Sequence, residues 1–332
     1  MRLSRCIGFL AIAAVCAFAQ HPAGSLLIVE TANHTAYVRD VTDYSILATK
    51  PGPAPAVLDK NFGQYTIIGD VVSVNGRPVK GTVLEMVNDF VMRPNPQPGQ
   101  AIADITRGGM IEWYFEILDQ SGNLIGSIRV SGVNGGPPPP GQTATIQQAS
   151  YVVVGGTGAF LGVHGYMGAS AGGSITPLRS ASMAEDPANR RTFPAGSVRQ
   201  GIYVLPMITP EIIATGGGPA IVHGSDYSLV TTAKPAKPGE VLVLFASGLG
   251  PTKPAPEPGQ PFGADPLPLA TSPIEVIMNG VSSEVQYAGG YPGAVDRYQV
   301  NFRVPDGIAS GMAALHLTTA WIAGADVKIP IQ

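Results

Sequence analysis

Two carboxylates spaced four residues apart are the first candidates for chemistry in this sequence. In the run IEWYFEIL, Glu112 and Glu116 share one face with Tyr114, while Trp113 and Phe115 share the other face with isoleucines. Successive side chains of a strand point to opposite faces. An inward carboxylate pair could act as general acid and base. The alternative, with the aromatic set inside and both carboxylates in solvent, avoids the desolvation cost of buried charges, and we favour it.

A glycine-rich turn is the second candidate. The stretch YVVVGGTGAFLGVHG resembles a dinucleotide-binding turn, in which glycines let the backbone approach a pyrophosphate. Such a turn must open a helix, but the residues after Gly158 hold too many glycines for one. Three residues separate Gly158 from Gly162, where the fingerprint has two, and the ribose-binding acid is missing. The sequence therefore predicts strand, turn and strand here, with no nucleotide.

Neither a serine nucleophile nor a metal site has the context that it needs. Ser170 in GASAG has the nucleophile-elbow spacing, and Asp226 and His316 follow in the required order, but no helix is predicted after the serine. The histidines stand too far apart for a local metal motif; they are His21, His34, His164, His223 and His316. The sequence therefore predicts no metal and no cofactor.

The first residues have the features of a secretory signal peptide. Arg2 and Arg5 precede the apolar run CIGFLAIAAVCAF, and Ala17 and Ala19 give a small-x-small cleavage site. The run is shorter than the roughly 20 residues of a membrane span, and we find no later apolar segment that is long enough. We therefore expect residues 1–19 to be removed and the protein to be secreted or otherwise extracytoplasmic.

Charge and cysteine content restrict the partners of the exported chain. Without Arg2 and Arg5 the formal charge falls from −3 to −5, which argues against nucleic acid as a partner. Both cysteines, Cys6 and Cys16, lie in the signal, so we expect no disulfide and no thiolate ligand or nucleophile in the remainder. The oligomeric state does not follow from the sequence.

Composition and turn residues predict an all-β protein. The chain has 42 glycines, 31 prolines and only 13% charged residues, which disfavours long amphipathic helices. Asn75-Gly76, Asn279-Gly280 and the segment QSGN before Leu124 mark hairpin turns between strands. A polar, charged stretch separates two strand-rich halves. We predict a first domain at 24–177, a boundary at 178–204 and a β-sandwich at 205–332.

The first half resembles the allene oxide cyclase/dirigent barrel family. The resemblance covers roughly residues 58–171 and rests mainly on the Gly-Gly-x-Gly-x-Phe turn at 155–160. GQYTIIGDV and IEWYFEILDQSGNLIGSIRVSG resemble the family's early strand and its hairpin before that turn. His164 stands where many members have arginine. The resemblance implies a closed antiparallel barrel of eight strands.

The second half resembles an Ig-like C-terminal domain found on exported acidobacterial proteins. Gly-Leu-Gly-Pro at 248–251 and YQVNFRVP at 298–305 carry this resemblance, which covers about residues 205–332. The function of that domain family is not established. The resemblance implies a sandwich fold and export, and it implies no chemistry.

Two functions are compatible with this fold. One is a barrel that binds a small apolar molecule or serves as a scaffold, fused to an Ig-like domain for surface display or adhesion. Its expected ligand-binding residues are Tyr65, Trp113, Phe115 and Tyr151. The other is a cyclase-like isomerase that acts on an unsaturated lipid or a phenol, the substrate types that the resemblance implies. The interior of the barrel distinguishes the two.

Overall fold

The fold is all-β, as expected. The computed structural model describes residues 24–39, 63–89, 98–99, 109–134, 149–169, 179–186, 188–192 and 196–332. The expected signal peptide and Ser170 lie outside these ranges. The described helix is a single turn, α1 (Asn189–Thr192), and in this part of the chain no helix has the length and apolar character to cross a membrane.

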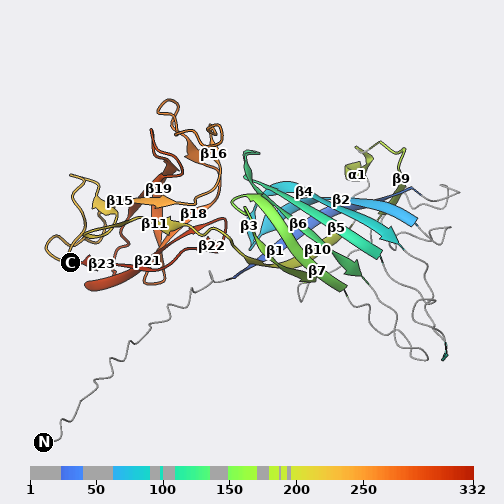
Figure 1. Ribbon diagram of the computed structural model, residues 1–332, viewed down its shortest axis with the longest axis horizontal. Helices are drawn as coiled ribbons and strands as arrows, with labels where there is room; N and C mark the ends of the chain where they lie inside the picture. The colour runs from blue at the N-terminus through green and yellow to red at the C-terminus, as the bar shows by residue number, and fades with distance from the viewer. Residues whose placement is uncertain are drawn as a thin grey trace, which may run out of the picture.

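The first domain is a closed antiparallel barrel of eight strands (Figure 1). Each strand pairs with the next along the chain, and the last one, β10, closes the barrel against β1. The barrel strands are β1 (Ser25–Val38), β2 (Gly63–Val74), β4 (Lys80–Asp89), β5 (Gly109–Leu118), β6 (Leu124–Asn134), β7 (Ala149–Gly158), β8 (His164–Ala169) and β10 (Ser197–Leu205). The short strand β3 (Arg77–Pro78) extends the hairpin between β2 and β4.

The predicted turns join strands at one end of the barrel, which we call the base. Asn75 and Gly76 have φ angles of 49° and 74°, the left-handed geometry that a two-residue hairpin turn requires. The next hairpin is held by Asp119, whose carboxylate accepts from the amides of Ser121 and Asn123 at 2.8 Å. The residues after Gly158 form a turn and then β8, so the prediction of strand, turn and strand is confirmed.

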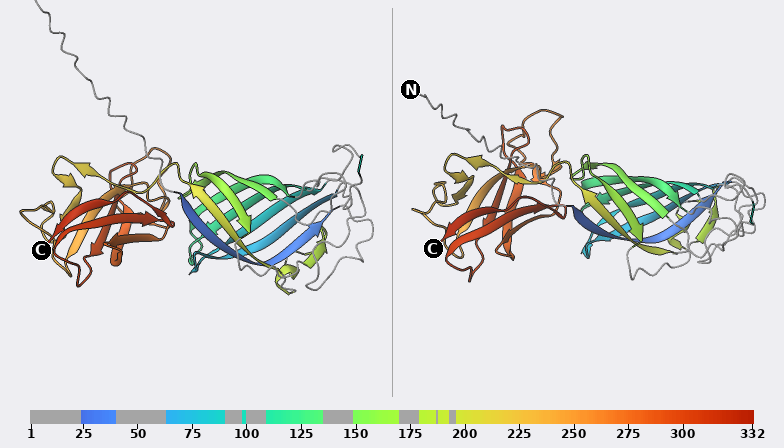
Figure 2. Two further views of the ribbon diagram at one scale, coloured as in Figure 1. Left: turned by 90° about the horizontal axis from the view of Figure 1, so that it is seen from below. Right: turned by 60° about the horizontal axis from the view of Figure 1, so that its bottom comes forward.

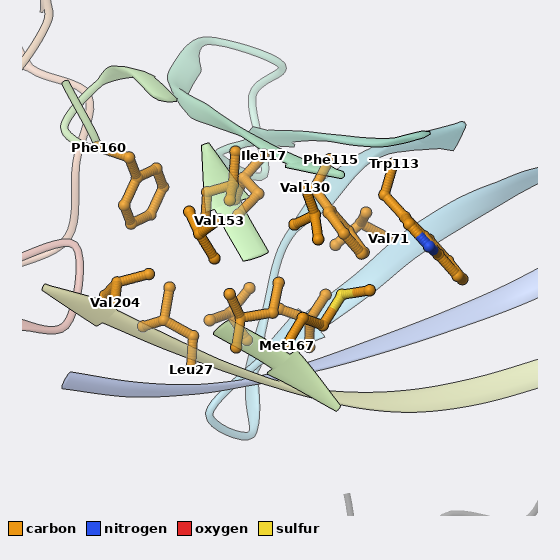
Figure 3. Packing of buried hydrophobic residues seen from close by; sticks show 14 of the residues in the cluster. Leu27, Val71, Trp113, Phe115, Ile117, Val130, Val153, Phe160, Met167 and Val204 are labelled. Carbon is orange, nitrogen blue, oxygen red and sulfur yellow. The ribbon is translucent and has the colours of Figure 1, made fainter. Parts of the chain in front are cut away.

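Apolar side chains from all eight strands fill the barrel (Figure 3). Phe160, from the glycine-rich turn, lies among them and is fully buried. Gly158 has a φ of 62°, and a Cβ there would lie 2.5 Å from the carbonyl oxygen of Ile125. The glycines of this turn thus allow close backbone approach, which is the role expected where a sheet closes.

The expected boundary at 178–204 is wrong for much of its length. Residues 197–205 form β10, which pairs with β8 on one side and with β1 on the other. A further strand, β9 (Arg179–Ser182), pairs in parallel with the end of β1. Ile202 and Val204 are fully buried in the barrel core. The closed barrel needs β10 as its eighth strand, although the surrounding sequence is polar.

Charged residues in this stretch bind the barrel wall and are not a solvated linker. Arg179 is fully buried and donates to both carboxylate oxygens of Glu185. Arg190 and Arg191 both donate to the carboxylate of Asp70 on β2, at 2.7–2.8 Å. These ion pairs attach the segment around α1 to the outside of the barrel, which explains why a charged stretch belongs to the domain.

The second domain is a curled, sandwich-like sheet. Its buried core draws on many of its strands, and Leu244, Phe302 and Leu317, from three different strands, are fully buried. The strands of the sheet are β11 (Glu211–Ile212), β14 (Ile221–His223), β15 (Val241–Ser247), β16 (Thr252–Lys253), β17 (Leu269–Ala270), β18 (Ile274–Met278), β19 (Val281–Gly290), β20 (Tyr298–Arg303), β21 (Gly311–Thr319), β22 (Ile322–Ala323) and β23 (Val327–Ile331). The short strands β12 (Ala214–Thr215) and β13 (Gly218–Pro219) pair with each other in a separate two-stranded sheet.

The second domain packs against the base of the barrel (Figure 2). Ala320 and Ile322, at the turn between β21 and β22, belong to the barrel's buried core, and Trp321 packs against it. Polar contacts surround this apolar centre: Arg77 pairs with Glu275 at 2.6 Å, and Lys253 donates to Asn123 at 2.7 Å. The base of the barrel is therefore covered by the second domain.

Candidate functional site

Strand β5 directs its aromatic residues into the barrel. Trp113 is 7% exposed and Phe115 is fully buried, and both belong to the barrel core. Tyr114, between them, is an exposed outward residue. The sequence prediction that the aromatic face points inward is confirmed, because strand alternation sends one set to each side.

The four expected ligand-binding residues belong to the barrel core or pack against it, and Figure 3 shows Trp113 and Phe115 side by side. The rings of Trp113 and Phe115 stack with centroids 5.8 Å apart and an interplanar angle of 3°. The ring of Tyr151, from β7, meets Trp113 edge-on at 6.4 Å. Tyr65, near the start of β2, is half-buried and packs against the same core. The structure thus assembles Trp113, Phe115 and Tyr151 into an aromatic group from two strands, with Tyr65 packed against the same core; the role of these residues in ligand binding stays a prediction.

The alternative acid/base pair lies outside the barrel. The side chain of Glu112 is 43% exposed. Its carboxylate accepts from the Ser131 hydroxyl at 2.7 Å and lies 3.7 Å from Arg129 on β6. Glu116 is likewise on the outer face, opposite the outward Ser127. Chemistry inside the barrel would therefore need a different carboxylate.

Glu85 is that carboxylate, and sequence reasoning missed it. It is 8% exposed and lies on the inward face of β4, paired with Ile67 on one side and with Trp113 on the other. Glu85 is two residues from both Val83 and Val87, which point inward, and this spacing was the feature of the sequence that could have placed it inside. Both faces of this stretch are apolar, however, so alternation alone did not reveal which one Glu85 shares.

Tyr151 experiences the charge of Glu85 across the interior. Burial and, secondarily, the negative charge of Glu85 raise the pKa of Tyr151 to about 12. The phenol therefore stays protonated at neutral pH and can donate a hydrogen bond. Trp113 supplies a second donor, because its buried Nε1 has no hydrogen-bond partner within the described residues. A carboxylate, a phenol and an indole N–H thus line the same interior region.

A buried histidine adds a neutral polar group to the barrel interior. The Nε2 atom of His34 lies 2.7 Å from the Thr31 hydroxyl, and its ring packs over Gly69 of β2. Burial, and then the positive charge of Arg190, lower the pKa of His34 to about 4, although the charge of Asp70 acts in the opposite direction. His34 is therefore neutral at pH 7. It lies in an irregular part of β1, where the pairing with β2 shifts register between Ala32 and Thr35.

The polar interior groups lie in the part of the barrel away from the second domain. Tyr65 and Tyr151 are near the starts of β2 and β7, at the end opposite the base hairpins. We call this the far end; β1, β4, β6 and β8 finish there. Toward the base, the interior is lined by buried aliphatic side chains and Phe160. The candidate site is therefore the interior at and below the far end.

The sequence predicts no metal site, and two histidines have acidic partners in the part of the chain that the structure describes. There, no group of three or more His, Cys, Asp or Glu side chains is placed to hold a metal ion. His223 is used in the second domain, where its Nδ1 lies 2.6 Å from the Glu240 carboxylate, and His316 pairs with Asp326 on the surface. In comparisons with known proteins, no family model, no curated protein and no solved structure matches this chain.

Proposed function

We propose that this is an exported two-domain protein whose barrel binds a small, mainly apolar molecule at its far end. The observation that carries the proposal is the aromatic group of Trp113, Phe115 and Tyr151, with Tyr65 packed against the same core, above a closely packed base. Ligand sites are typically apolar surfaces with a few converging polar groups, and this interior has that composition.

The polar groups define what the ligand should carry. The Tyr151 hydroxyl and Trp113 Nε1 can each donate a hydrogen bond, while the inward Glu85 can accept one if ionised. A single hydroxyl or similar group on the ligand could use both kinds of partner. An otherwise apolar body would then lie against the aromatic rings, where burial of apolar surface supplies most of the binding free energy.

Tryptophan fluorescence tests this binding. The chain has two tryptophans, so Trp321→Phe leaves Trp113 as the sole reporter, and Trp113→Phe leaves Trp321. We expect 4-propylphenol or oleic acid to change the emission of the Trp321→Phe protein in a saturable way. The Trp113→Phe protein should show little change, because Trp321 lies at the base. An equal response from both proteins, or none from either, would contradict the proposal.

A second function, a cyclase-like isomerase, is favoured by one observation. Glu85 is a carboxylate inside the barrel near Tyr151, as the effect of its charge on the Tyr151 pKa indicates. Such a carboxylate could stabilise developing positive charge or move a proton during rearrangement of an unsaturated lipid or a phenol. This function agrees with the resemblance of the first half to the allene oxide cyclase/dirigent family, and we propose that resemblance together with it.

A matched pair of variants separates enzyme from binding protein. Glu85→Gln removes the inward carboxylate, and Glu112→Gln removes an outward one from the neighbouring strand. If the protein is an isomerase, turnover of an unsaturated fatty-acid epoxide should fall at least about a hundredfold in Glu85→Gln, within the range for general acid–base catalysis. Glu112→Gln should keep full activity. Absence of turnover in the wild type would leave ligand binding as the supported function.

Export and the role of the second domain belong to the same proposal. We infer export from the basic start, apolar run and cleavage site before residue 20, and surface display from the resemblance to an Ig-like domain. Expression with fractionation tests this: the protein should be found outside the cytoplasm with Gln20 as its first residue. Retention in the cytoplasm at full length would contradict it.

A further inference from the structure

A second pocket lies at the junction of the two domains, which Figure 2 shows at the base of the barrel. It has a volume of about 360 Å³, within the range of small-molecule sites, and such sites are frequent between domains. We call it the junction pocket. One wall comes from β3, the turn between β5 and β6, and β6, and the other comes from the segment between β17 and β18. The junction pocket therefore lies at the opposite end of the barrel from the interior site.

The surface of the junction pocket is mainly apolar. Val79 and Ile125 belong to the buried barrel core and line the pocket from one side, beside Pro78. Pro273 lines it from the second domain. Its carbonyl accepts from the amide of Ala320 at 3.0 Å, which fixes Pro273 to the turn that packs on the barrel core. The pocket suits a compact apolar body, whose burial would supply most of the binding free energy.

Two polar contacts hold the walls of the junction pocket together. The hydroxyl of Thr271, in the second domain, donates to the carbonyl of Leu124, in the barrel, at 2.6 Å. Arg77, in the barrel, pairs with Glu275, in the second domain, at 2.6 Å. Because each domain supplies one wall, the pocket is complete only while the domains are docked. A molecule that binds there therefore stabilises the docked arrangement.

The charged side chains that line the junction pocket already have partners. Arg77 pairs with Glu275. The carboxylate of Asp119 accepts from the backbone amides of Ser121 and Asn123 at 2.8 Å and from the Asn123 side chain at 2.7 Å. An ionised ligand would lose its hydration and find its possible counter-charges engaged, which is costly. The pocket therefore favours a neutral molecule.

Ser272 supplies a hydrogen-bond donor that the protein itself does not use. The residue lines the junction pocket and is only 5% exposed. Its buried Oγ has no hydrogen-bond partner within the described residues. The neighbouring Thr271 hydroxyl, in contrast, is engaged by the Leu124 carbonyl. A buried hydroxyl without a partner is unfavourable, and a ligand oxygen that accepts from it would remove that cost.

We propose that the junction pocket binds a small neutral molecule with an apolar body and one carbonyl oxygen. The apolar body lies against Val79, Ile125 and Pro273, and the carbonyl oxygen accepts a hydrogen bond from Ser272. Such a molecule uses both features of the pocket, whereas a hydrocarbon leaves the hydroxyl unpaired and an ion finds the charges engaged. Occupancy also stabilises the docking of the two domains, because both contribute to the site.

A titration of the full chain with 4-fluoroacetophenone, followed by ligand-observed fluorine NMR, tests the proposal. The hydrocarbon 1-ethyl-4-fluorobenzene, which lacks the carbonyl oxygen, is the matched probe. We expect Ser272→Ala to weaken binding of the ketone about fivefold, the effect of one neutral hydrogen bond, and to leave the hydrocarbon within about twofold. Val79→Thr should weaken both probes, because it places a hydroxyl in the apolar wall. In calorimetry, the ketone should raise the temperature of the first unfolding transition.

Three controls locate the effect. Ser283 is buried like Ser272, and its Oγ also has no partner within the described residues, but it does not line the junction pocket. Ser283→Ala should leave both probes unaffected. Ser272 also lines a hollow of the second domain together with Leu269, so Leu269→Ala tests that hollow and should have no effect. Trp113→Phe alters the interior site and should also have no effect.

Four results would overturn the proposal. The first is that 4-fluoroacetophenone does not bind at millimolar concentration. The second is that Ser283→Ala, Leu269→Ala or Trp113→Phe weakens its binding as much as Ser272→Ala does. The third is that Val79→Thr leaves both probes unchanged. The fourth is that the ketone binds without shifting the first unfolding transition, because a site shared by both domains must stabilise their docking.

Discussion

Replacing Trp113 tests both the packing of the barrel and the state of its indole nitrogen. The Trp113 side chain is only 7% exposed, stacks on Phe115 and contacts Tyr151. A buried aromatic side chain removes roughly 150–250 Å² from water, worth about 4–6 kcal/mol at 25 cal/mol per Å². Measured losses for Trp→Ala in cores are about 3–5 kcal/mol. We expect Trp113→Ala to lose about that amount.

The buried Nε1 modifies this expectation. It has no hydrogen-bond partner within the described residues, and an unsatisfied buried donor costs about 1–3 kcal/mol. Trp113→Phe removes that donor but keeps an aromatic ring at position 113 that can stack on Phe115. We therefore expect Trp113→Phe to lie within about 1 kcal/mol of the wild type, since the lost volume and the removed penalty oppose each other.

Urea unfolding measures both variants in the same assay. Trp321 packs against the barrel core, so its fluorescence reports unfolding in every protein of the series, with circular dichroism as a second probe. Tyr114→Ala, the adjacent outward residue, is the control and should change stability by no more than about 0.5 kcal/mol. A loss below about 1 kcal/mol for Trp113→Ala would refute the packing argument. A loss in Trp113→Phe equal to that in Trp113→Ala would refute the argument about the nitrogen.

Three further predictions follow from the barrel wall and its base. The pKa of His34 is about 4 in the folded state against 6.5 in the unfolded state, so between these pH values the unfolded state binds a proton that the folded state does not, and the protein loses about 3 kcal/mol of stability as pH falls through that window. Urea unfolding at pH 7 and at pH 4.5 should therefore show a smaller loss of stability for His34→Gln than for the wild type. An equal loss in both proteins would contradict this. Gly158→Ala should destabilise the protein by more than about 2 kcal/mol, because the new Cβ would meet the Ile125 carbonyl. Gly122 has open space around it, so Gly122→Ala should cost only about 1 kcal/mol. Similar losses for the two variants on thermal unfolding would contradict the argument from close backbone approach at Gly158. Trp321→Ala should uncouple the two domains, seen in calorimetry as a lower first transition, and an unchanged profile would mean that the base contact contributes little.

Local features of the sequence were enough to predict the fold class and the inward face of β5. Asn-Gly pairs specify tight turns because few residues tolerate positive φ, and both such turns, at Asn75 and Asn279, have that geometry. The alternation around Trp113 works for a similar reason: between Ile111 and Ile117, two glutamates and a tyrosine alternate with isoleucines, tryptophan and phenylalanine, so only one register buries the larger apolar set.

Only the tertiary structure decided the identity of the interior carboxylate and the extent of the barrel. Glu85 stands in a stretch where both faces are apolar, so its direction depends on pairing with β2 and β5, far away in sequence. Strand β10 follows a charged segment whose arginines read as solvated, yet Arg179 is buried on Glu185 and Arg190 binds Asp70. Burial of a charge depends on a partner that folding brings close, and a local pattern carries no information about that partner.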